Sequence, residues 1–598
     1  MSTLDLGLIG NCCFGALVDP YARIVWCCLP RFDGEPVFDA LLRGDADGEA
    51  AAGGSFAIEL GGAVKAEQRY VPNTPVLVTR ITADDGAAIE ITDFAPRFKR
   101  HDRMFRPTTI VRHVRPVAGL PRIRIRVSPS FGWGAVDPQV TRGSNHIRWV
   151  GPSQTVRLTT DAVPSYILDQ TWFLLDAPVS MLLGADESLT DSIPETARVF
   201  FDDTVRYWRD WTRSLNIPFE WQAEVIRSAI TLKLCTFEET GAVIAAMTTS
   251  IPEAPHSQRN WDYRYCWLRD AYFVVHTLNR LSATRTLEHY LRYIQNIVAK
   301  TAEGAVLQPL YSITLDDRIE ERIVDTLPGY RGMGPVRVGN QAYQQVQHDV
   351  FGSVILAVTQ SFFDTRLTRM GDEALYRQLT RLGRVAVERF DVPDAGIWEL
   401  RTRASVHTFS ALMCWAAADR LARIATALGL DDEAADWLAH AETMHARICN
   451  EAWSDELGGF SATFGGRDLD ASLLLIHELG FLAGDDPRYV GTVEAIEKGL
   501  KRGNHVFRYD APDDFGTPEV AFTVCTFWFI EALAAVGRKD EARQMFAEVL
   551  ACRNSLGLLS EDVDPVTGEL WGNFPQTYSM VGLIKCAMRL SRPWEDVV

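Results

Sequence analysis

The sequence lacks the features that would tie it to a nucleic acid or to a membrane. Its 598 residues include 60 Lys and Arg against 78 Asp and Glu, a formal net charge of −18, and the basic residues are scattered. Binding to a phosphate backbone needs clustered cations, so we exclude nucleic acids as the main partners. No uncharged apolar run reaches about 18 residues, so we expect no membrane-spanning segment.

Cysteine is present, but without the spacings of a metal site or a disulfide framework. There are 11 Cys residues, an odd number, and none of them forms a CxxC pair. We therefore expect buried, reduced thiols and no metal site. The first residues show no basic segment followed by a long apolar run, which predicts no leader peptide and a cytoplasmic protein.

Common signatures of nucleotide-binding proteins, serine hydrolases and zinc hydrolases are also missing. Walker A, GxSxG and HExxH motifs do not occur. The glycine-rich segment 329–334 follows no predicted strand, so we do not expect it to hold a phosphate. Hydrophobic residues make up 47% of the chain and charged residues 23%, which is an ordinary globular composition.

What is present begins with a β-rich region of about 200 residues. Short runs that alternate or carry β-branched residues are bounded by Gly, Pro and Asp. These runs lie at 76–82, 89–93, 123–127 and 156–160. Many short strands at such spacing are typical of an antiparallel sandwich, so we expect a β-sandwich over residues 1–200.

Helical patterns fill the rest of the chain. The first has apolar residues on one face and predicts a linker helix over 201–218. Twelve more are expected within 219–598, at about 219–238, 268–281, 283–302, 342–366, 373–390, 408–429, 432–453, 470–480, 488–502, 518–536, 538–552 and 576–592. Connections of about 1 to 7 residues alternate with connections of about 15 to 39.

This alternation of loop lengths predicts the topology of the helical region. Short connections join antiparallel neighbours, so six hairpins would place every long loop at one end, as in an (α/α)6 barrel. The expected fold is therefore an α+β multidomain protein, an N-terminal antiparallel β-sandwich followed by an (α/α)6 barrel over 219–598. We expect the long loops to carry the functional site.

The first long loop ends in a segment, 259–270, that is dense in aromatic residues, Arg and Asp. Aromatic faces stack on the apolar face of a pyranose, and Asp and Arg bind its hydroxyl groups, so the segment indicates sugar binding. Asp270 is expected near a helix N-terminus, which favours an anionic side chain. A buried ion-pair network that ties the loop to the helix is the alternative.

Glu399 follows Trp398 in the third long loop. A carboxyl group beside an apolar ring is partly desolvated, which suits a general acid that must keep its proton near neutral pH. The alternative is an ion pair of Glu399 with Arg401 or Arg403.

The last long loop carries several carboxylates between Glu561 and Glu569. One of them would face Glu399 across the barrel mouth and activate water, since inverting glycoside hydrolysis needs two carboxyl groups about 6.5–9.5 Å apart. A calcium-like turn or a merely solvated turn is the alternative, although the spacing is not that of an EF-hand.

Several motifs together carry a family resemblance. They are RNWDYRYCWLRDA at 259–271, GYRGMGPVRVGN at 329–340, QHDVFG at 347–352, GIWELR at 396–401 and SEDVDPVTGELWGNFPQ at 560–576. From about Leu6 to Ile584 the chain resembles glycoside hydrolase family 15, the inverting exo-α-glucosidases that include glucoamylases and bacterial trehalases. The segments 9–11 and 26–33 resemble the trehalase-like N-terminal domain of that family. The resemblance implies the same two-part fold and a hydrolase that needs no cofactor and no metal.

The resemblance also implies roles for single residues. Glu399 matches the general acid and Glu561 the general base. Arg269 and Asp270 match the pair that holds the non-reducing glucose. Further matches to motif positions that line the sugar subsites are Trp261, Tyr330, Arg331, Trp398 and Asn573.

The substrate is less tightly specified than the chemistry. The stretch after the acid, 402–415, and QHDVFG resemble the trehalase type more than the glucoamylase type. We therefore expect hydrolysis of a small-molecule α-glucoside, α,α-trehalose, with release of β-glucose. A glucoamylase or an isomaltose- or malto-oligosaccharide-type α-glucosidase is the alternative, and a disaccharide phosphorylase or a non-catalytic sugar-binding protein is a more distant one. A homo-oligomer stays open.

Overall fold

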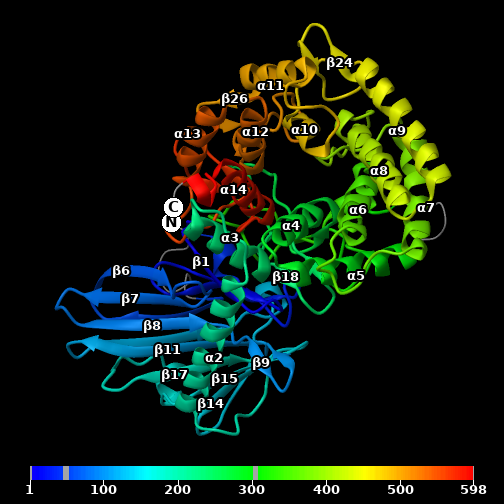
Figure 1. The fold of residues 1–598 in the computed structure, drawn as a ribbon. Coiled ribbons are helices and arrows are strands. Elements are labelled where there is room, and N and C mark those ends of the chain that lie inside the picture. The colour runs from blue at the N-terminus through cyan, green and yellow to red at the C-terminus, as the bar shows by residue number, and fades with distance from the viewer. Residues whose placement is uncertain (1–2, 45–52, 301–306, 597–598) are drawn as a thin grey trace.

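The computed structural model describes residues 3–44, 53–300 and 307–596. Figure 1 shows two regions, a body of β-strands formed by the first part of the chain and a ring of helices formed by the rest. Both expected halves of the fold are confirmed, the antiparallel sheet domain and the (α/α)6 barrel that follows it.

The N-terminal region consists of two antiparallel sheets packed face to face. One sheet contains β1 (Gly7–Gly10), β2 (Gly15–Val18), β3 (Ile24–Cys28), β4 (Pro36–Phe38), β5 (Ser55–Leu60), β12 (Arg122–Ser128) and β16 (Phe173–Leu174). The other contains β6 (Ala63–Tyr70), β7 (Leu77–Ala83), β8 (Ala88–Phe94), β11 (Thr109–Ala118), β13 (Gln139–Arg142), β14 (His146–Val150), β15 (Thr155–Thr160) and β17 (Val179–Gly184). A separate hairpin pairs β9 (Phe98–Arg100) with β10 (Arg103–Phe105), and a short helix α1 spans Pro164–Leu168. The inward-facing apolar side chains of the two sheets form one core, as alternation along each strand predicts.

A buried arginine, paired with a carboxylate of its own sheet, connects the two sheets through this core. The guanidinium of Arg112 on β11 binds Asp93 on β8, with Nε to Oδ1 at 2.7 Å, and neither side chain is exposed. The same guanidinium donates from Nη1 to the carbonyl oxygen of Phe56 on β5, at 2.7 Å. A buried pair of this kind is costly to break from one side, because the remaining charge loses its partner.

The helix after the sheets, α2 (Ile193–Arg213), begins before the expected linker range of 201–218. Pro194 lies in its first turn, where a missing amide hydrogen costs nothing. Its buried side chains, among them Ile193 and Val205, pack on the outer face of the larger sheet. The helix therefore belongs as much to the sheet region as to the link.

The barrel is a double ring of helices. The inner ring contains α4 (Leu268–Arg280), α6 (Asp349–Thr359), α8 (Thr408–Ala427), the short α10 (Ile476–Leu479) preceded by a 3-10 turn, α12 (Thr523–Ala535) and α14 (Thr577–Leu590). The outer ring contains α3 (Gln222–Leu234), α5 (Thr284–Lys300), α7 (Glu373–Arg389), α9 (Asp431–Ala452), α11 (Pro487–Leu500) and α13 (Lys539–Leu550). Each inner helix packs on the next, and α14 packs back on α4, which closes the ring (Figure 1).

The residue pattern decides which helices lie inside. The sequence of α12, TVCTFWFIEALAA, has a single charged residue, and its first eleven residues are buried, so this helix can only be surrounded by protein. By contrast, α5 buries Leu287, Leu291 and Ile294 on one face and exposes charged residues on the other. Such an amphipathic helix covers the ring from outside.

All of the long connections enter the inner helices at their N-terminal ends, so they gather at one end of the barrel. Short strands brace them: β18 (Thr236–Phe237), β19 (Ala242–Val243), β20 (Cys266–Trp267), β21 (Leu310–Tyr311), β22 (Arg322–Val324), β23 (Val336–Val338), β24 (Trp453–Ser454), β25 (Gly459–Phe460), β26 (Lys501–Arg502), β27 (His505–Val506), β28 (Ala521–Phe522), β29 (Asp562–Val563) and β30 (Leu570–Trp571).

The sheet region supports the loops at this end. Arg264, in the first long loop, is fully buried in an ion pair with Asp262 and donates from Nη1 to the carbonyl oxygen of Gly34, at 2.7 Å. In the last long loop, the side-chain amide of Asn554 donates to the carbonyl oxygens of Leu4 (3.1 Å) and Leu6 (2.9 Å). The N-terminal region therefore supports both the first and the last of the long loops.

Candidate active site

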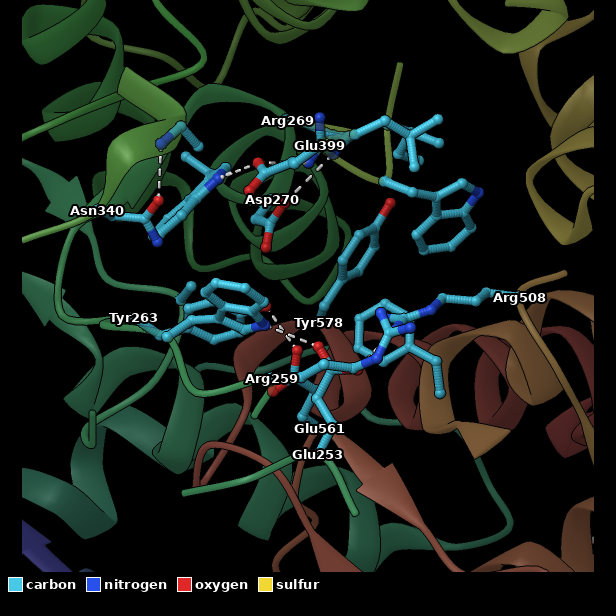
Figure 2. Close-up of a pocket in the computed structure, with 18 of the residues that line it drawn as sticks. Glu253, Arg259, Tyr263, Arg269, Asp270, Asn340, Glu399, Arg508, Glu561 and Tyr578 are labelled. Atoms are coloured by element: carbon cyan, nitrogen blue, oxygen red, sulfur yellow. Dashed lines mark hydrogen bonds and ion pairs between the residues drawn. The ribbon is translucent and has the colours of Figure 1, made fainter. Parts of the chain in front are cut away.

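A pocket opens at the end of the barrel where the inner helices begin (Figure 2). Its walls come from the first, second, third, fifth and last long loops and from the first turns of α4 and α14. Among the residues expected at the site, the pocket is lined by Trp261, Arg269, Asp270, Trp398, Glu399 and Glu561. Backbone amides at the N-termini of the inner helices point toward it, which makes the local field favourable for carboxylates.

Glu399 projects from a tight turn of the third long loop. Its own φ is +59°, and the turn also needs Gly396 at φ +68°, where a Cβ would lie 2.8 Å from the ring of His407. A non-glycine residue with positive φ is strained and persists only where the surroundings hold it. The loop therefore aims this carboxyl group in a direction that ordinary backbone would not give.

Three side chains on other elements engage one oxygen of Glu399. The indole Nε1 of Trp267 donates to Oε1 at 2.6 Å, and Gln347 donates from Nε2 at 3.4 Å. The Nη2 of Arg269 lies 3.6 Å from the same oxygen. The side chain of Glu399 remains 23% exposed, so it faces the pocket.

The ring that lies against Glu399 is Trp267, whereas the expected ring was Trp398. The indole of Trp398 donates from Nε1 to Asp470 Oδ2 at 2.9 Å and packs on Trp528. Trp398 and Glu399 are consecutive residues of one tight turn, and the sequence gives no sign of the direction in which each side chain points.

The ion pair that was the alternative for Glu399 does not form. Arg401 pairs instead with Glu321, at 3.0 Å, and Arg403 donates to the carbonyl oxygen of Pro512, at 2.8 Å.

Glu561 lies in the opposite wall, and the residue is only 1% exposed. Its Oε1 accepts a hydrogen bond from the hydroxyl of Tyr263 at 2.6 Å, and its Oε2 accepts one from the backbone N–H of Asn573 at 3.2 Å. Burial raises the pKa of Glu561 and the nearby carboxylate of Glu253 raises it further, while these hydrogen bonds lower it. The carboxyl group is thus held by donors at both oxygens.

Asn573 is not among the residues that line the pocket. Its side-chain Oδ1 accepts a hydrogen bond from Thr248 at 2.8 Å, and its Nδ2 donates to the carbonyl oxygen of Trp261 at 2.9 Å. Through its backbone and side chain it joins the last long loop, which carries Glu561, to the first.

Arg269 and Asp270 occupy the first turn of α4, where the sequence analysis expects them. Arg269 lies 3.6 Å from Asp270 and 3.0 Å from Asp349, the first residue of α6. Burial and the charge of Glu399 raise the pKa of Asp270 to about 6, against the lowering effect of Arg269. The two residues extend into the pocket beside Glu399 (Figure 2).

Tyr330 and Arg331 lie outside the pocket lining. Tyr330 is fully buried and meets Trp571 edge to face, while Arg331 pairs with Glu569 at 2.7 Å. Glu569 is therefore engaged on the flank of the last loop and does not face Glu399.

Four residues of the site were not named in the sequence analysis: Glu253, Tyr263, Trp267 and Arg508. Glu253 accepts hydrogen bonds from Trp261 at 2.8 Å and from Arg508 at 2.6 Å, within the wall that holds Glu561. Tyr263 and Trp267 stand within the motif at 259–271 and could be singled out by their aromatic type. Glu253 and Arg508 come from loops far apart in the chain, and neither lies in a quoted motif.

The acidic last loop is not built as a cation site. Within residues 3–44, 53–300 and 307–596 no group of three or more His, Cys, Asp or Glu side chains is arranged to hold a metal ion. Over the same residues, no helix is long and apolar enough to cross a membrane.

Comparisons with known proteins bear on both regions. Residues 222–588 match the family model described as glycosyl hydrolases family 15, and residues 4–172 match the model described as trehalase-like, N-terminal. A trehalase of Mycobacterium tuberculosis is 32% identical over 618 residues, which covers 97% of this chain and 88% of that protein. A trehalase of Thermoplasma volcanium is 29% identical over 592 residues and covers 98% and 93%.

Among solved structures, a bacterial glucoamylase complexed with acarbose superposes with a TM-score of 0.68 at 13% identity. The match covers 98% of this chain and 94% of that one. At such low identity the likeness shows the fold alone, and it extends over the sheet region as well as the barrel.

Proposed function

Because the chain belongs to glycosyl hydrolase family 15, we propose that it hydrolyses α,α-trehalose to two molecules of glucose with inversion at the anomeric carbon. That it is a glycoside hydrolase follows from the family. Trehalose is supported by similarity to trehalases over nearly the full length of both chains, sheet region included. The observation that carries the mechanism is that Glu399 and Glu561 stand in opposite walls of one pocket lined by aromatic and charged side chains.

Glu399 is the general acid of this proposal. The donors Trp267 and Gln347 both engage Oε1, so in the acid form the proton resides on Oε2. From there it passes to the glycosidic oxygen as the bond from that oxygen to C1 breaks. The strained turn fixes the direction of this transfer.

Glu561 is the general base. As a carboxylate it accepts hydrogen bonds from Tyr263 and Asn573 and takes a proton from the water that attacks C1 on the face opposite to the leaving group. The product at that carbon is therefore β-glucose. The surrounding aromatic residues exclude bulk water, which strengthens these interactions.

The glucose unit between the two carboxyl groups is held by the remaining walls. Arg269 and Asp270 bind its hydroxyl groups, and Trp261 and Trp398 give it apolar surfaces. The hydroxyl of Tyr578 is buried in this lining and has no hydrogen-bond partner among the described residues, so it is free to bind a sugar hydroxyl.

The cellular setting is part of the same proposal. All 11 cysteines are free thiols. Free thiols suit the reducing cytoplasm, where we place the reaction. A homo-oligomeric state stays a prediction.

Proton NMR of the purified protein with trehalose, maltose, isomaltose and a longer malto-oligosaccharide tests the proposal, because it reports the linkage cut and the anomer formed first. β-Glucose from trehalose is the expected result. β-Glucose only from the other sugars would keep the mechanism and replace the substrate. α-Glucose as the first new anomer would contradict the role of Glu561, and glucose 1-phosphate formed only with phosphate present would indicate a phosphorylase.

A further inference from the structure

The segment 347–349 leads into α6, which begins at Asp349, and none of its residues lines the pocket. We propose that Gln347 and Asp349 are positioning residues that act through Arg269 to keep Glu399 oriented and protonated. The inference rests on the proposed function, since it assigns the means by which the general acid holds its proton.

Gln347 joins the acid to the arginine. It is fully buried, and its Oε1 accepts a hydrogen bond from Arg269 Nη1 at 3.0 Å. Its Nε2 donates to Glu399 Oε1 at 3.4 Å and to Gln345 Oε1 at 3.0 Å. One amide therefore fixes the separation of the guanidinium and the carboxyl group without adding charge.

Asp349 balances the charge of Arg269. It is fully buried, and its Oδ2 accepts a hydrogen bond from Arg269 Nη1 at 3.0 Å, closer than Asp270 or Glu399, each of which lies at 3.6 Å. Asp349 is also the first residue of α6, and helix N-termini favour acidic side chains. The cation is thus neutralised mainly from the side away from the pocket.

In this proposal, the pairing of Arg269 with Asp349 decides whether Glu399 can serve as an acid. The charged and titratable groups that face Glu399 are Arg269 and Asp270 on α4 and Tyr263 on the first long loop, while Asp349 on α6 faces Arg269. An Arg without a nearer carboxylate would favour the ionised form of Glu399 and leave no proton to donate at neutral pH. In this proposal Asp349 opposes that effect, because it is the carboxylate closest to Arg269.

The same segment holds the loop of the acid in place. The backbone N–H of His348 donates to Asp394 Oδ2 at 2.8 Å, and Ser410 on α8 donates to the same oxygen at 2.7 Å. Asp394 in turn pairs with Ser405 through two backbone hydrogen bonds, at 2.9 and 3.2 Å, which closes the base of the loop that carries Glu399. Helix α6 therefore sets both the place and the charge state of the acid.

Two substitutions that change the charge in opposite directions test the proposal. Asp349→Asn removes a negative charge beside Arg269, so the basic limb of the kcat/KM profile should move to lower pH by about one unit and kcat at neutral pH should fall about 10- to 100-fold. Gln347→Glu adds a negative charge on the other side, so the basic limb should move to higher pH. Asp349→Glu restores the charge and should return the limb toward its original position.

The matched control is Asp93→Asn in the sheet region, which disrupts a buried Asp–Arg pair far from the pocket. It should lower the melting temperature and leave the pH profile unchanged. A basic limb that stays in place in both Asp349→Asn and Gln347→Glu would overturn the proposal, and if one variant does not fold the other decides. A wild-type protein without activity on any α-glucoside would instead overturn the proposed function, so the two failures are distinguishable.

Discussion

The two walls of the pocket hold the same kind of side chain in opposite surroundings. Glu399 is partly exposed, accepts hydrogen bonds from Trp267 and Gln347 and lies beside a guanidinium. Glu561 is buried, and this burial together with the carboxylate of Glu253 raises its pKa. The motifs assign the proton donor to Glu399 and the proton acceptor to Glu561, and variants that change the surroundings of each carboxyl group test these proposed roles.

The strongest test of this contrast is removal of each carboxyl group in turn. Glu399→Gln and Glu561→Gln should each lower kcat on trehalose by about 1,000-fold or more, because each removes one of two proton transfers. The variants should differ on α-glucosyl fluoride, whose leaving group needs no proton. Glu399→Gln should keep substantial activity on the fluoride and Glu561→Gln should not, and the reverse order would exchange the two roles.

Removing the hydrogen-bond donor to Glu561, the proposed base, should shift the pKa of this carboxyl group. Tyr263→Phe deletes the 2.6 Å hydrogen bond that lowers the pKa of Glu561, so that pKa rises. Because the base must be ionised, the acid limb of the kcat/KM profile should move to higher pH, with kcat down about 10-fold. If the acid limb, measured in the same buffers, does not move, Tyr263 does not affect the pKa of Glu561.

Removing the carboxylate of Glu253 should lower the pKa of Glu561. Glu253→Gln deletes a charge that raises the pKa of Glu561, so the acid limb should move to lower pH. The effect on kcat at neutral pH should be smaller, a rise of a few-fold, because a lower pKa increases the ionised fraction of Glu561. A shift in the same direction as Tyr263→Phe would contradict this account.

The smallest effect on kcat and KM is expected for a residue outside the walls that carry Glu399 and Glu561. Arg331→Ala removes an ion pair with Glu569 on the last long loop. Arg331 does not line the pocket, so the pocket keeps all of its side chains. KM for trehalose and kcat should each change by less than about 3-fold, as is usual for a pair of which one partner is well exposed. A large rise in KM would return Arg331 to the substrate-binding residues.

The helical part of the fold was largely predictable because loop length and apolar period are local properties. Each expected helix overlaps one of α3 to α14, but some begin later than expected. The helix expected from residue 342 begins at Asp349, because Asn340 caps a short 3-10 turn over Gln341–Gln344 and extended backbone at Gln345 separates that turn from the helix. The helix expected from 518 begins at Thr523, after Pro518 and the short strand β28.

The site was predictable where one segment carries several of its residues. Arg269, Asp270 and Trp261 share the motif at 259–271 and all line the pocket. Glu253 and Arg508 could not be paired in advance, because their contact exists only once the ring has closed. The direction of Trp398 likewise depends on Asp470, a residue of another loop.

Because α14 closes the ring on α4, the barrel can be completed only late in synthesis of the protein. A chain emerging from the ribosome presents the sheet region first and the loop that carries Glu561 almost last. Neither the inner ring nor the pocket is complete until α14 has been translated, and the contact of Asn554 with Leu4 and Leu6 ties this late loop to the sheet region. A chain that stops before α14 lacks the helix that closes the ring and the pocket residue Tyr578, so we expect no hydrolysis from it.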